Sequence, residues 1–167
     1  MSNEEMLIEN KWSFGPPIDI DFHVGEGSIT SIALSLGKQG MTWRVWGNQS
    51  NKRLEERIEA WLSQYGRGKQ PDVAIPLDMA KMPVFTYRAL EAIRAIPFGT
   101  TLSYGQVAQI ISHPQAARAI GSACRRNPFP LIIPCHRVLD SQQQLRGYSA
   151  GEGLKLKRCL LDFEGIS

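Results

Sequence analysis

A connector rich in glycine, proline and charge separates two halves of the chain that carry different hydrophobic periods. It spans Gly66 to Pro83. Before it, residues 18–24 alternate apolar and polar side chains, as a half-buried β-strand does. After it, apolar residues return every three or four positions, as on one face of an α-helix. This switch of period predicts two lobes, an α/β lobe over 1–78 and a mostly α lobe over 79–167.

Composition excludes several broad classes of protein. Of the 167 residues, 43% are hydrophobic, enough for a packed core and too many for a disordered chain. No apolar run is long enough to cross a membrane, and the acidic N-terminal stretch lacks the apolar segment of a secretory signal. Three cysteines cannot all pair with one another, which favours a reducing compartment. We therefore expect a cytoplasmic protein, or a nuclear one in a eukaryote, with no membrane partner.

The two halves also differ in charge. Residues 1–80 hold 8 Lys and Arg against 11 Asp and Glu, a net charge of −3, whereas residues 81–167 hold 11 against 5, a net charge of +6. A basic half joined to an acidic half is typical of a protein in which one lobe meets a polyanion. An unevenly charged but merely solvated surface would give the same count, and charge alone leaves both explanations open.

The N-terminal lobe is predicted to contain a three-stranded sheet and a helix. Strands are expected at Ile18–Val24, Ile29–Leu34 and Thr42–Trp46, with a turn at Gly25–Gly27. The helix prediction covers Leu54 to Tyr65, where apolar residues form one stripe and Gly66 is positioned to cap the C-terminal end.

Three helices are predicted in the C-terminal lobe. The first begins near Pro83 and ends before Pro97. The second begins with a capping box, in which Ser103 and Gln106 close the first turn reciprocally. The third runs over 115–126, after a short break, and two short helices joined by a tight turn resemble a helix-turn-helix.

The third helix has two distinct faces. At about 100° per residue, the small or apolar residues fall on one side, and Arg118, Ser122 and Arg125 fall on the other. The polar side is either a solvated helix face or a surface that lies along a DNA groove, with arginines reaching phosphates or the base stack.

A cysteine beside a histidine follows an apolar run. Residues 131–133 are predicted to form a short buried strand that leads into Pro134–Val138, with Cys135 and His136 adjacent. Cationic neighbours lower the pKa of a thiol, and the thiolate is the nucleophile. The alternative is a buried structural cysteine with an unrelated histidine, because adjacent side chains on a strand point to opposite faces.

Several motifs in order along residues 79–167 resemble the O6-alkylguanine-DNA alkyltransferases, also called methylated-DNA–protein-cysteine methyltransferases. The Pro-Cys-His-Arg-Val sequence at 134–138 resembles the family's active-site signature. The other matching segments are Ile96–Gly99 with Ser103-Tyr104, Ala116–Gly121, Arg126–Pro128, Gly147–Ser149 and Leu160–Gly165. The resemblance therefore covers the whole of the C-terminal lobe.

The resemblance implies a DNA repair activity in which an alkyl group moves irreversibly from O6-alkylguanine, and in some cases O4-alkylthymine, to a cysteine. Cys135 would be the nucleophile and alkyl acceptor, with His136 as its base through a bound water and Glu164 orienting the histidine. Asn127 would brace the active-site turn, and Tyr104 would help rotate the nucleotide and donate a proton toward the guanine O6. Because no route to hydrolyse the S-alkyl cysteine is present, each molecule would act once.

The resemblance also implies how double-stranded DNA is bound. The third helix would enter the minor groove, and Arg118 would fill the gap left by the flipped base. The other implied DNA contacts are Ala117, Ser122, Arg125 and Tyr104, and the implied walls of the base pocket are Pro134, Val138, Gly147, Tyr148 and Ser149.

In the same family the N-terminal lobe is a small domain resembling ribonuclease H, without catalytic residues, and the protein is a monomer. Some members carry a structural zinc there, but this lobe has no cysteine and one histidine, so no metal and no cofactor are expected. Lys81–Phe85 and Arg146 depart from the family pattern, and Arg146 lies where it could alter the pocket rim. Two alternative functions are a recognition module that flips alkylated guanine without chemistry, and a thiol hydrolase acting on small substrates.

Overall fold

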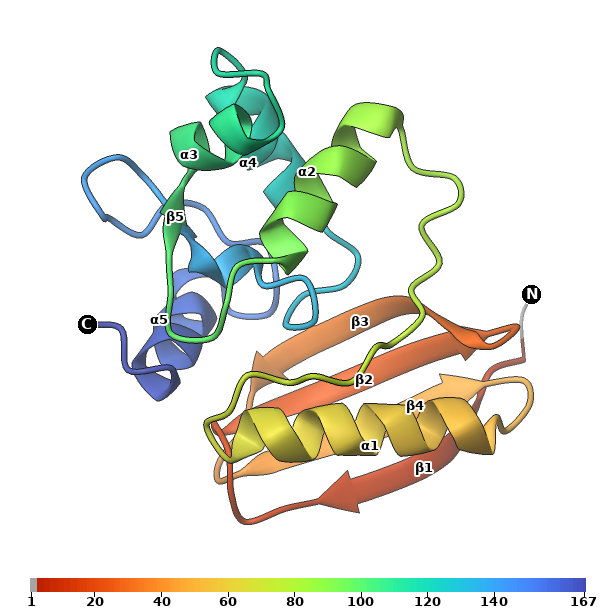
Figure 1. Ribbon diagram of the computed structural model, residues 1–167. Coiled ribbons are helices and arrows are strands. Elements are labelled where there is room, and N and C mark those ends of the chain that lie inside the picture. Colours follow the sequence, from red (N-terminus) through yellow and green to blue (C-terminus); the bar gives the residue numbers. More distant parts are fainter. Residues whose placement is uncertain (1–2) are drawn as a thin grey trace. The chain divides into compact units, whose positions relative to one another are not determined.

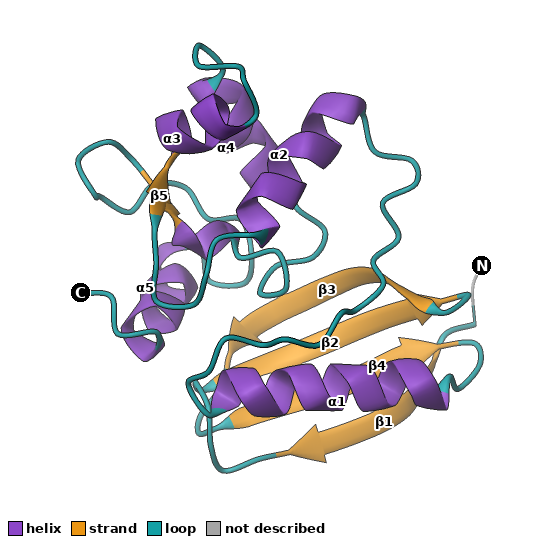
Figure 2. Ribbon diagram, in the orientation of Figure 1, coloured by secondary structure: helices purple, strands orange, loops and turns teal. Residues whose placement is uncertain are grey.

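The computed structural model describes residues 3–167. These divide between Asp78 and Met79 into two compact units (Figure 1). The first unit contains four strands and a long helix, and the second contains four α-helices joined by longer loops (Figure 2). No helix among the described residues is long and apolar enough to cross a membrane.

A mixed four-stranded sheet forms most of the first unit. The strands are β1 (Glu5–Lys11), β2 (Ile18–Gly25), β3 (Ser28–Leu36) and β4 (Met41–Gly47), in the spatial order β1-β4-β2-β3. β2 and β4 are parallel, and the other two pairs are antiparallel. The three predicted strands are confirmed as β2, β3 and β4, but the prediction of a three-stranded sheet is wrong because it lacks β1. That strand lies at the edge, is largely exposed and contains an irregularity between Met6 and Ile8, so it lacks the alternation that marks a half-buried strand.

Helix α1 (Lys52–Gly66) packs its apolar stripe on the sheet. Asn51 caps its N-terminus by accepting a hydrogen bond from the Leu54 amide at 3.0 Å. The predicted helix is confirmed, but Gly66 is its last residue rather than the cap, and the cap position is occupied by Arg67. A Cβ atom at position 66 would lie 2.4 Å from the terminal methyl carbon of Met41 and 3.0 Å from the Phe14 ring, so a larger residue there would require these side chains to shift.

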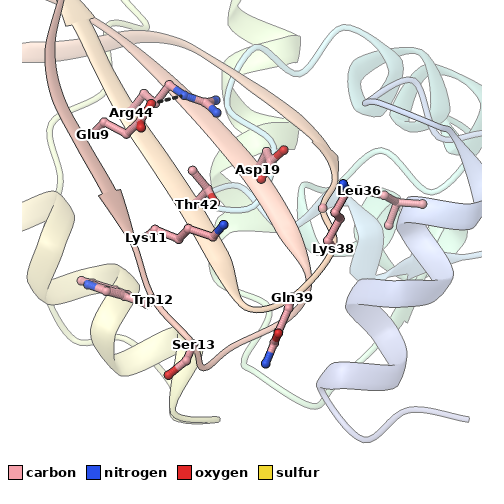
Figure 3. A pocket seen from close by; sticks show the side chains of 11 residues that line it. Glu9, Lys11, Trp12, Ser13, Asp19, Leu36, Lys38, Gln39, Thr42 and Arg44 are labelled. Carbon is pink, nitrogen blue, oxygen red and sulfur yellow. Dashed lines mark hydrogen bonds and ion pairs between the residues drawn. The ribbon is translucent and has the colours of Figure 1, made fainter.

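The opposite face of the sheet is polar. Arg44 on β4 pairs with Glu9 on β1 at 2.9 Å and with Asp21 on β2 at 3.3 Å. Asp21 also accepts a hydrogen bond from the Trp46 indole at 2.8 Å. Part of this face is hollowed into an open pocket of about 870 Å³, and Figure 3 marks the Arg44–Glu9 pair in its lining. Apolar burial on one face and charged pairs on the other give the sheet its alternating pattern.

The second unit is built from short helices. They are α2 (Val84–Arg94), α3 (Tyr104–Ile110), α4 (Ala117–Arg125) and α5 (Leu154–Phe163), with a two-stranded parallel sheet of β5 (Leu102–Ser103) and β6 (Val138–Leu139). All three helices predicted before the cysteine are confirmed, and α4 is slightly shorter than expected. The predicted capping box at the start of α3 is present, with Ser103 Oγ accepting from the Gln106 amide at 3.1 Å and the Gln106 side chain accepting from the Ser103 amide at 2.8 Å.

Candidate active site

The candidate nucleophile lies in a single turn of 3-10 helix, η1 (Cys135–Arg137), immediately before β6. Cys135 is 4% exposed. Its thiol accepts a hydrogen bond from Asn127 Nδ2 at 3.2 Å, and the same amide nitrogen donates to the Ile133 carbonyl at 2.9 Å. The Asn127 side-chain oxygen accepts from the Phe129 amide at 2.9 Å. One asparagine therefore fixes both the loop and the sulfur atom.

The segment before this turn differs from the sequence prediction. Residues 131–133 form a buried turn instead of a strand, with Leu131 in the left-handed region at φ 77° and an isolated bridge between Pro130 and Ile133. The prolines at 128, 130 and 134 have no amide donors, so this stretch cannot form a regular ladder. Its apolar side chains are buried all the same, which is why the local pattern resembles that of a buried strand.

A histidine, a glutamate and an arginine form a buried network behind the cysteine. His136 Nε2 lies 2.5 Å from Glu164 Oε2, and Arg137 Nε lies 2.6 Å from Glu164 Oε1. Arg137 Nη1 also donates to the Ile96 carbonyl at 2.7 Å, and the Gly99 amide donates to Glu164 Oε1 at 3.2 Å. Burial alone would raise the pKa of Glu164, but the hydrogen bonds and charges of His136 and Arg137 lower it to about 2. Glu164 is thus held as a carboxylate against the imidazole.

The carboxylate decides the tautomer of the histidine. An ionised carboxylate only accepts hydrogen bonds, so in the neutral imidazole Nε2 carries the proton and Nδ1 has a free lone pair. Nδ1 is buried and makes no hydrogen bond with the described residues. Burial lowers the pKa of His136, although Glu164 acts in the opposite direction. The ring is therefore set up to accept a proton at Nδ1.

The cysteines have different electrostatic surroundings. Burial raises the pKa of Cys135, but the hydrogen bond from Asn127 and the positive charge of Lys157 both lower it. Cys124, on the packed side of α4, has its pKa raised to about 12, mainly by burial. Burial thus raises the pKa of both thiols, and Cys135 differs from Cys124 in that a side-chain hydrogen bond, from Asn127, acts against this rise.

Two tyrosines predicted for the site lie in the same unit. Tyr104 begins α3, and its hydroxyl donates to the Arg146 carbonyl at 3.4 Å. Burial is the main reason that its pKa rises to about 12. The Tyr148 hydroxyl is buried without a hydrogen-bond partner among the described residues, and burial also raises its pKa. Both phenols therefore keep their protons at neutral pH.

The loop between β6 and α5 holds the remaining predicted pocket residues. Asp140 organises it by accepting hydrogen bonds from the Gln142 and Gln144 amides and an ion pair from Arg146 Nε at 2.9 Å. Ser149 Oγ donates to the Arg125 carbonyl at 2.9 Å and so ties the loop to α4. The other predicted pocket residues are Pro134 and Val138, which are buried, and Gly147, which is exposed with φ 23°.

Helix α4 presents the polar face predicted from its sequence. Arg118 and Arg125 are exposed, and Arg125 Nη2 donates to Ser122 Oγ at 3.1 Å. Ala117 is half-buried at the start of the helix, and Ile120 is fully buried on the opposite side. Both arginines therefore lie on the solvent-exposed side of α4, away from the hydrophobic core.

Sequence reasoning missed two buried, positively charged residues of the second unit, Arg137 and Lys157. Arg137 belongs to the Pro-Cys-His-Arg-Val motif without an assigned role, and Lys157 lies outside all the matching segments. Lys157 stands among apolar neighbours on the buried face of α5, next to Leu156 and three residues before Leu160. A charged residue within an apolar helical stripe is the signal that could have identified it.

The fold and this site define a class of protein: a two-unit chain in which a buried cysteine lies beside a histidine–glutamate pair, in the unit that also carries an arginine-bearing helix. Residues 84–166 match the family model described as 6-O-methylguanine DNA methyltransferase, DNA binding domain. The methylated-DNA–protein-cysteine methyltransferase of Mycobacterium leprae is 36% identical over 152 residues, which cover 91% of this chain and 90% of that protein. The constitutive enzyme of Bacillus subtilis is 37% identical, covering 85% and 86%.

A solved structure agrees with these matches. The Mycobacterium tuberculosis OGT in complex with DNA aligns with a TM-score of 0.65 at 29% identity, covering 87% of this chain and 92% of that one. The chain therefore belongs to the family of methylated-DNA–protein-cysteine methyltransferases.

Proposed function

We propose that this protein repairs DNA by transferring the alkyl group of O6-alkylguanine to Cys135. The observation that carries the proposal is the buried Cys135 thiol, held by Asn127 next to the His136–Glu164 pair in a chain of this family. The substrate class follows from relatives named for methylated DNA and from the relative whose structure contains DNA.

The transfer is a displacement at the alkyl carbon. The thiol proton passes through a bound water to His136 Nδ1, and the sulfur then attacks the carbon that is bonded to O6. The carbon–oxygen bond breaks as the carbon–sulfur bond forms, and the guanine leaves with the electron pair. The Tyr104 hydroxyl donates a proton toward O6, so that a neutral guanine is released, and its own proton is restored from the histidine through solvent. The thioether product has no hydrolytic route, so each molecule acts once.

DNA binding is assigned to α3, the following turn and α4, acting as a helix-turn-helix. We infer that α4 enters the minor groove, that the target nucleotide rotates out of the stack and that Arg118 fills the space it leaves. The other residues proposed to contact DNA on this surface are Ala117, Ser122, Arg125 and Tyr104. The exposed arginines of α4 and the surplus of positive charge in residues 81–167 support this assignment.

The pocket for the extruded base is assigned to the surroundings of Cys135. Its walls would be Pro134, Val138, Gly147, Tyr148 and Ser149. Support comes from the hydrogen bond that ties Ser149 to α4 and from the buried phenol of Tyr148. Such a pocket lets the alkyl carbon meet the sulfur away from bulk water.

The two units receive different roles in this proposal. Residues 79–167 form the DNA-binding and alkyl-transfer domain, and residues 1–78 form a ribonuclease H-like domain without catalytic residues. We further propose that the protein acts as a monomer without a metal or cofactor, in the cytoplasm or in the nucleus of a eukaryote. A reducing compartment suits a reaction that needs a free thiol, and the three cysteines are unpaired.

The Cys135→Ala variant tests the assignment by separating chemistry from binding. A duplex with one O6-methylguanine should still be bound by this variant, while methyl transfer disappears. The matched control is Cys159→Ala, which removes a half-buried thiol on α5 and should leave both properties intact. Methyl transfer by Cys135→Ala would overturn the proposal. Binding without transfer by the parent protein would instead favour a recognition module, and ester hydrolysis without any effect of DNA would favour a thiol hydrolase.

A further inference from the structure

Asp140 is the centre of a small hydrogen-bonded loop that follows β6. Its carboxylate Oδ1 accepts hydrogen bonds from the Gln142 amide at 2.9 Å and from the Gln144 amide at 2.8 Å. Its Oδ2 lies 2.9 Å from Arg146 Nε. The hydrogen bond from the Gln144 amide and then the one from Arg146 lower the pKa of Asp140, so the side chain is a carboxylate at neutral pH. One carboxylate therefore fastens the two ends of the segment 140–146 to each other.

The main chain at Arg146 holds the hydroxyl of Tyr104. The Arg146 carbonyl accepts a hydrogen bond from the Tyr104 hydroxyl at 3.4 Å and another from the Lys157 ammonium at 3.0 Å. Arg146 is thus tethered twice, through its carbonyl to α5 and through its guanidinium to Asp140. The bond to Tyr104 is long and therefore weak, so the phenol can exchange this acceptor for another at little cost.

The carbonyl of Arg146 lies at the start of the segment that we assign to the base pocket. Residues 147–149 follow it directly, and Ser149 Oγ fastens their far end to α4 through the Arg125 carbonyl at 2.9 Å. A phenol held by the Arg146 carbonyl keeps its oxygen beside this segment. A phenol that loses this acceptor is free to turn toward solvent. A donor that is oriented before the substrate arrives pays no ordering cost during the reaction.

We propose that Asp140 is a positioning residue for Tyr104. Its ion pair with Arg146 keeps the Arg146 carbonyl in place, and that carbonyl directs the Tyr104 hydroxyl toward the base pocket. When an extruded guanine enters, O6 replaces the carbonyl as the acceptor of the phenol. The part that Asp140 plays in alkyl transfer rests on the proposed function, whereas its effect on Tyr104 in the free protein does not.

Two variants break the ion pair, one from each side. Asp140→Asn removes the charge but keeps an oxygen that accepts the two amide hydrogen bonds. Arg146→Gln removes the guanidinium, which is 67% exposed as part of its side chain, and leaves the main-chain carbonyl. Asp162→Asn is the matched control, because it removes the carboxylate of an exposed ion pair elsewhere in the same unit. Circular dichroism checks that each variant is folded, and if Asp140→Asn is not, Arg146→Gln decides the outcome.

The first measurement follows Tyr104 in the absence of DNA. Protein labelled with 3-fluorotyrosine gives a fluorine-19 resonance for each of the four tyrosines, and Tyr104→Phe identifies the resonance of Tyr104. That resonance should shift in Asp140→Asn and in Arg146→Gln, because the phenol loses its fixed acceptor, and should stay in place in Asp162→Asn. A Tyr104 resonance that is unchanged in the folded ion-pair variants would overturn the inference.

The second measurement is single-turnover methyl transfer from a duplex with one O6-methylguanine, at saturating protein. With Tyr104 present, each ion-pair variant should slow transfer by about three- to tenfold at unchanged duplex affinity, since a misdirected general acid loses part of its contribution of about 10²–10⁴-fold. In the Tyr104→Phe background the same substitutions should have no further effect. Equal slowing in both backgrounds contradicts the inference, because general damage to the pocket loop gives that result.

The two measurements separate this inference from the proposed function. If the parent protein accepts a methyl group and the variants behave alike in both backgrounds, the inference fails and the proposed function stands. If the parent accepts no methyl group but the Tyr104 resonance shifts in the variants, the proposed function is wrong and the positioning of Tyr104 by Asp140 stands.

Discussion

The two units bury different kinds of side chain. In the first, the core is apolar and aromatic, and the charged side chains of β1, β2 and β4 pair on the open face of the sheet. In the second, one histidine and three charged side chains are buried within a stretch of 29 residues, namely His136, Arg137, Lys157 and Glu164. Charged side chains on the exposed face of the sheet cost little free energy, whereas each buried charge of the second unit must be paired or hydrogen-bonded.

The largest expected effect comes from removing the central carboxylate of the buried network. Glu164→Gln keeps the volume of the side chain but leaves Arg137 without its counter-charge and His136 without the acceptor that fixes its tautomer. We expect a loss of about 3–5 kcal/mol in the free energy of unfolding. The rate of methyl transfer should fall by about 10²–10⁴-fold, the range for loss of general base catalysis.

Urea unfolding and single-turnover transfer measure these two effects. The control is Asp162→Asn, which removes an exposed carboxylate from α5, two residues before Glu164, where it pairs with Arg158. Equal losses of unfolding free energy and of transfer rate in the two variants would contradict the expectation that the buried carboxylate contributes more than the exposed one.

The same network predicts how stability depends on pH. The pKa of Glu164 is lowered to about 2 in the folded state, so its contribution is fully present above the unfolded value near 4.5 and is lost as the pH falls toward 2. The lowered pKa of His136 acts with the same sign, since the unfolded state binds more protons below about pH 6.5. The free energy of unfolding of the whole protein is measured as a function of pH. The parent protein should lose stability on acidification, and Glu164→Gln should lose less. A steeper loss in the variant would contradict this account.

Shortening a buried side chain in the first unit should lower the free energy of unfolding without changing the rate of methyl transfer. Ile58 is fully buried on α1, and Ile58→Val removes one methylene group. The expected cost is about 0.5–1.5 kcal/mol in the free energy of unfolding, with the rate of methyl transfer unchanged under folded conditions. Thermal unfolding and the transfer assay together check this. A slower transfer by the folded variant would mean that the first unit takes part in the chemistry.

The smallest effect is expected on the open face of the sheet. Glu9→Gln breaks the ion pair with Arg44, in which Glu9 is 52% exposed, and leaves the contact of Arg44 with Asp21 in place. The change in the free energy of unfolding should be about 0.2–1 kcal/mol and should shrink at high salt. Urea unfolding at low and high ionic strength measures it. A loss of unfolding free energy as large as that of Glu164→Gln would contradict the expectation that exposed ion pairs contribute less to stability than buried ones.

Local sequence patterns were sufficient to predict a helix or strand wherever one face of that element is buried. The alternation at Ile18–Val24 identified β2, and the stripe from Leu54 to Tyr65 identified α1. The pattern failed at β1, an edge strand, and at residues 131–133, where a proline-interrupted turn is as apolar as a strand.

The site was predictable only in part. Cys135 and His136 are adjacent in the sequence, but Glu164 lies 28 residues from His136, and no local pattern links them. Its assignment came from a resemblance to a family. The hydrogen bonds of Arg137 and Lys157 reach carbonyls 41 and 19 residues away, at Ile96 and Val138, so their partners depend on the tertiary fold.

The central claim is that Cys135 itself receives the alkyl group, and one measurement addresses it directly. The purified protein is mixed with a duplex that holds a single O6-methylguanine, and its intact mass is recorded before and after. The account predicts a gain of one methyl group per molecule, located in the peptide that contains Cys135, with an equal amount of duplex returned to guanine. A protein that binds the duplex without a gain in mass, or one methylated at Cys124 or Cys159 instead, would contradict it.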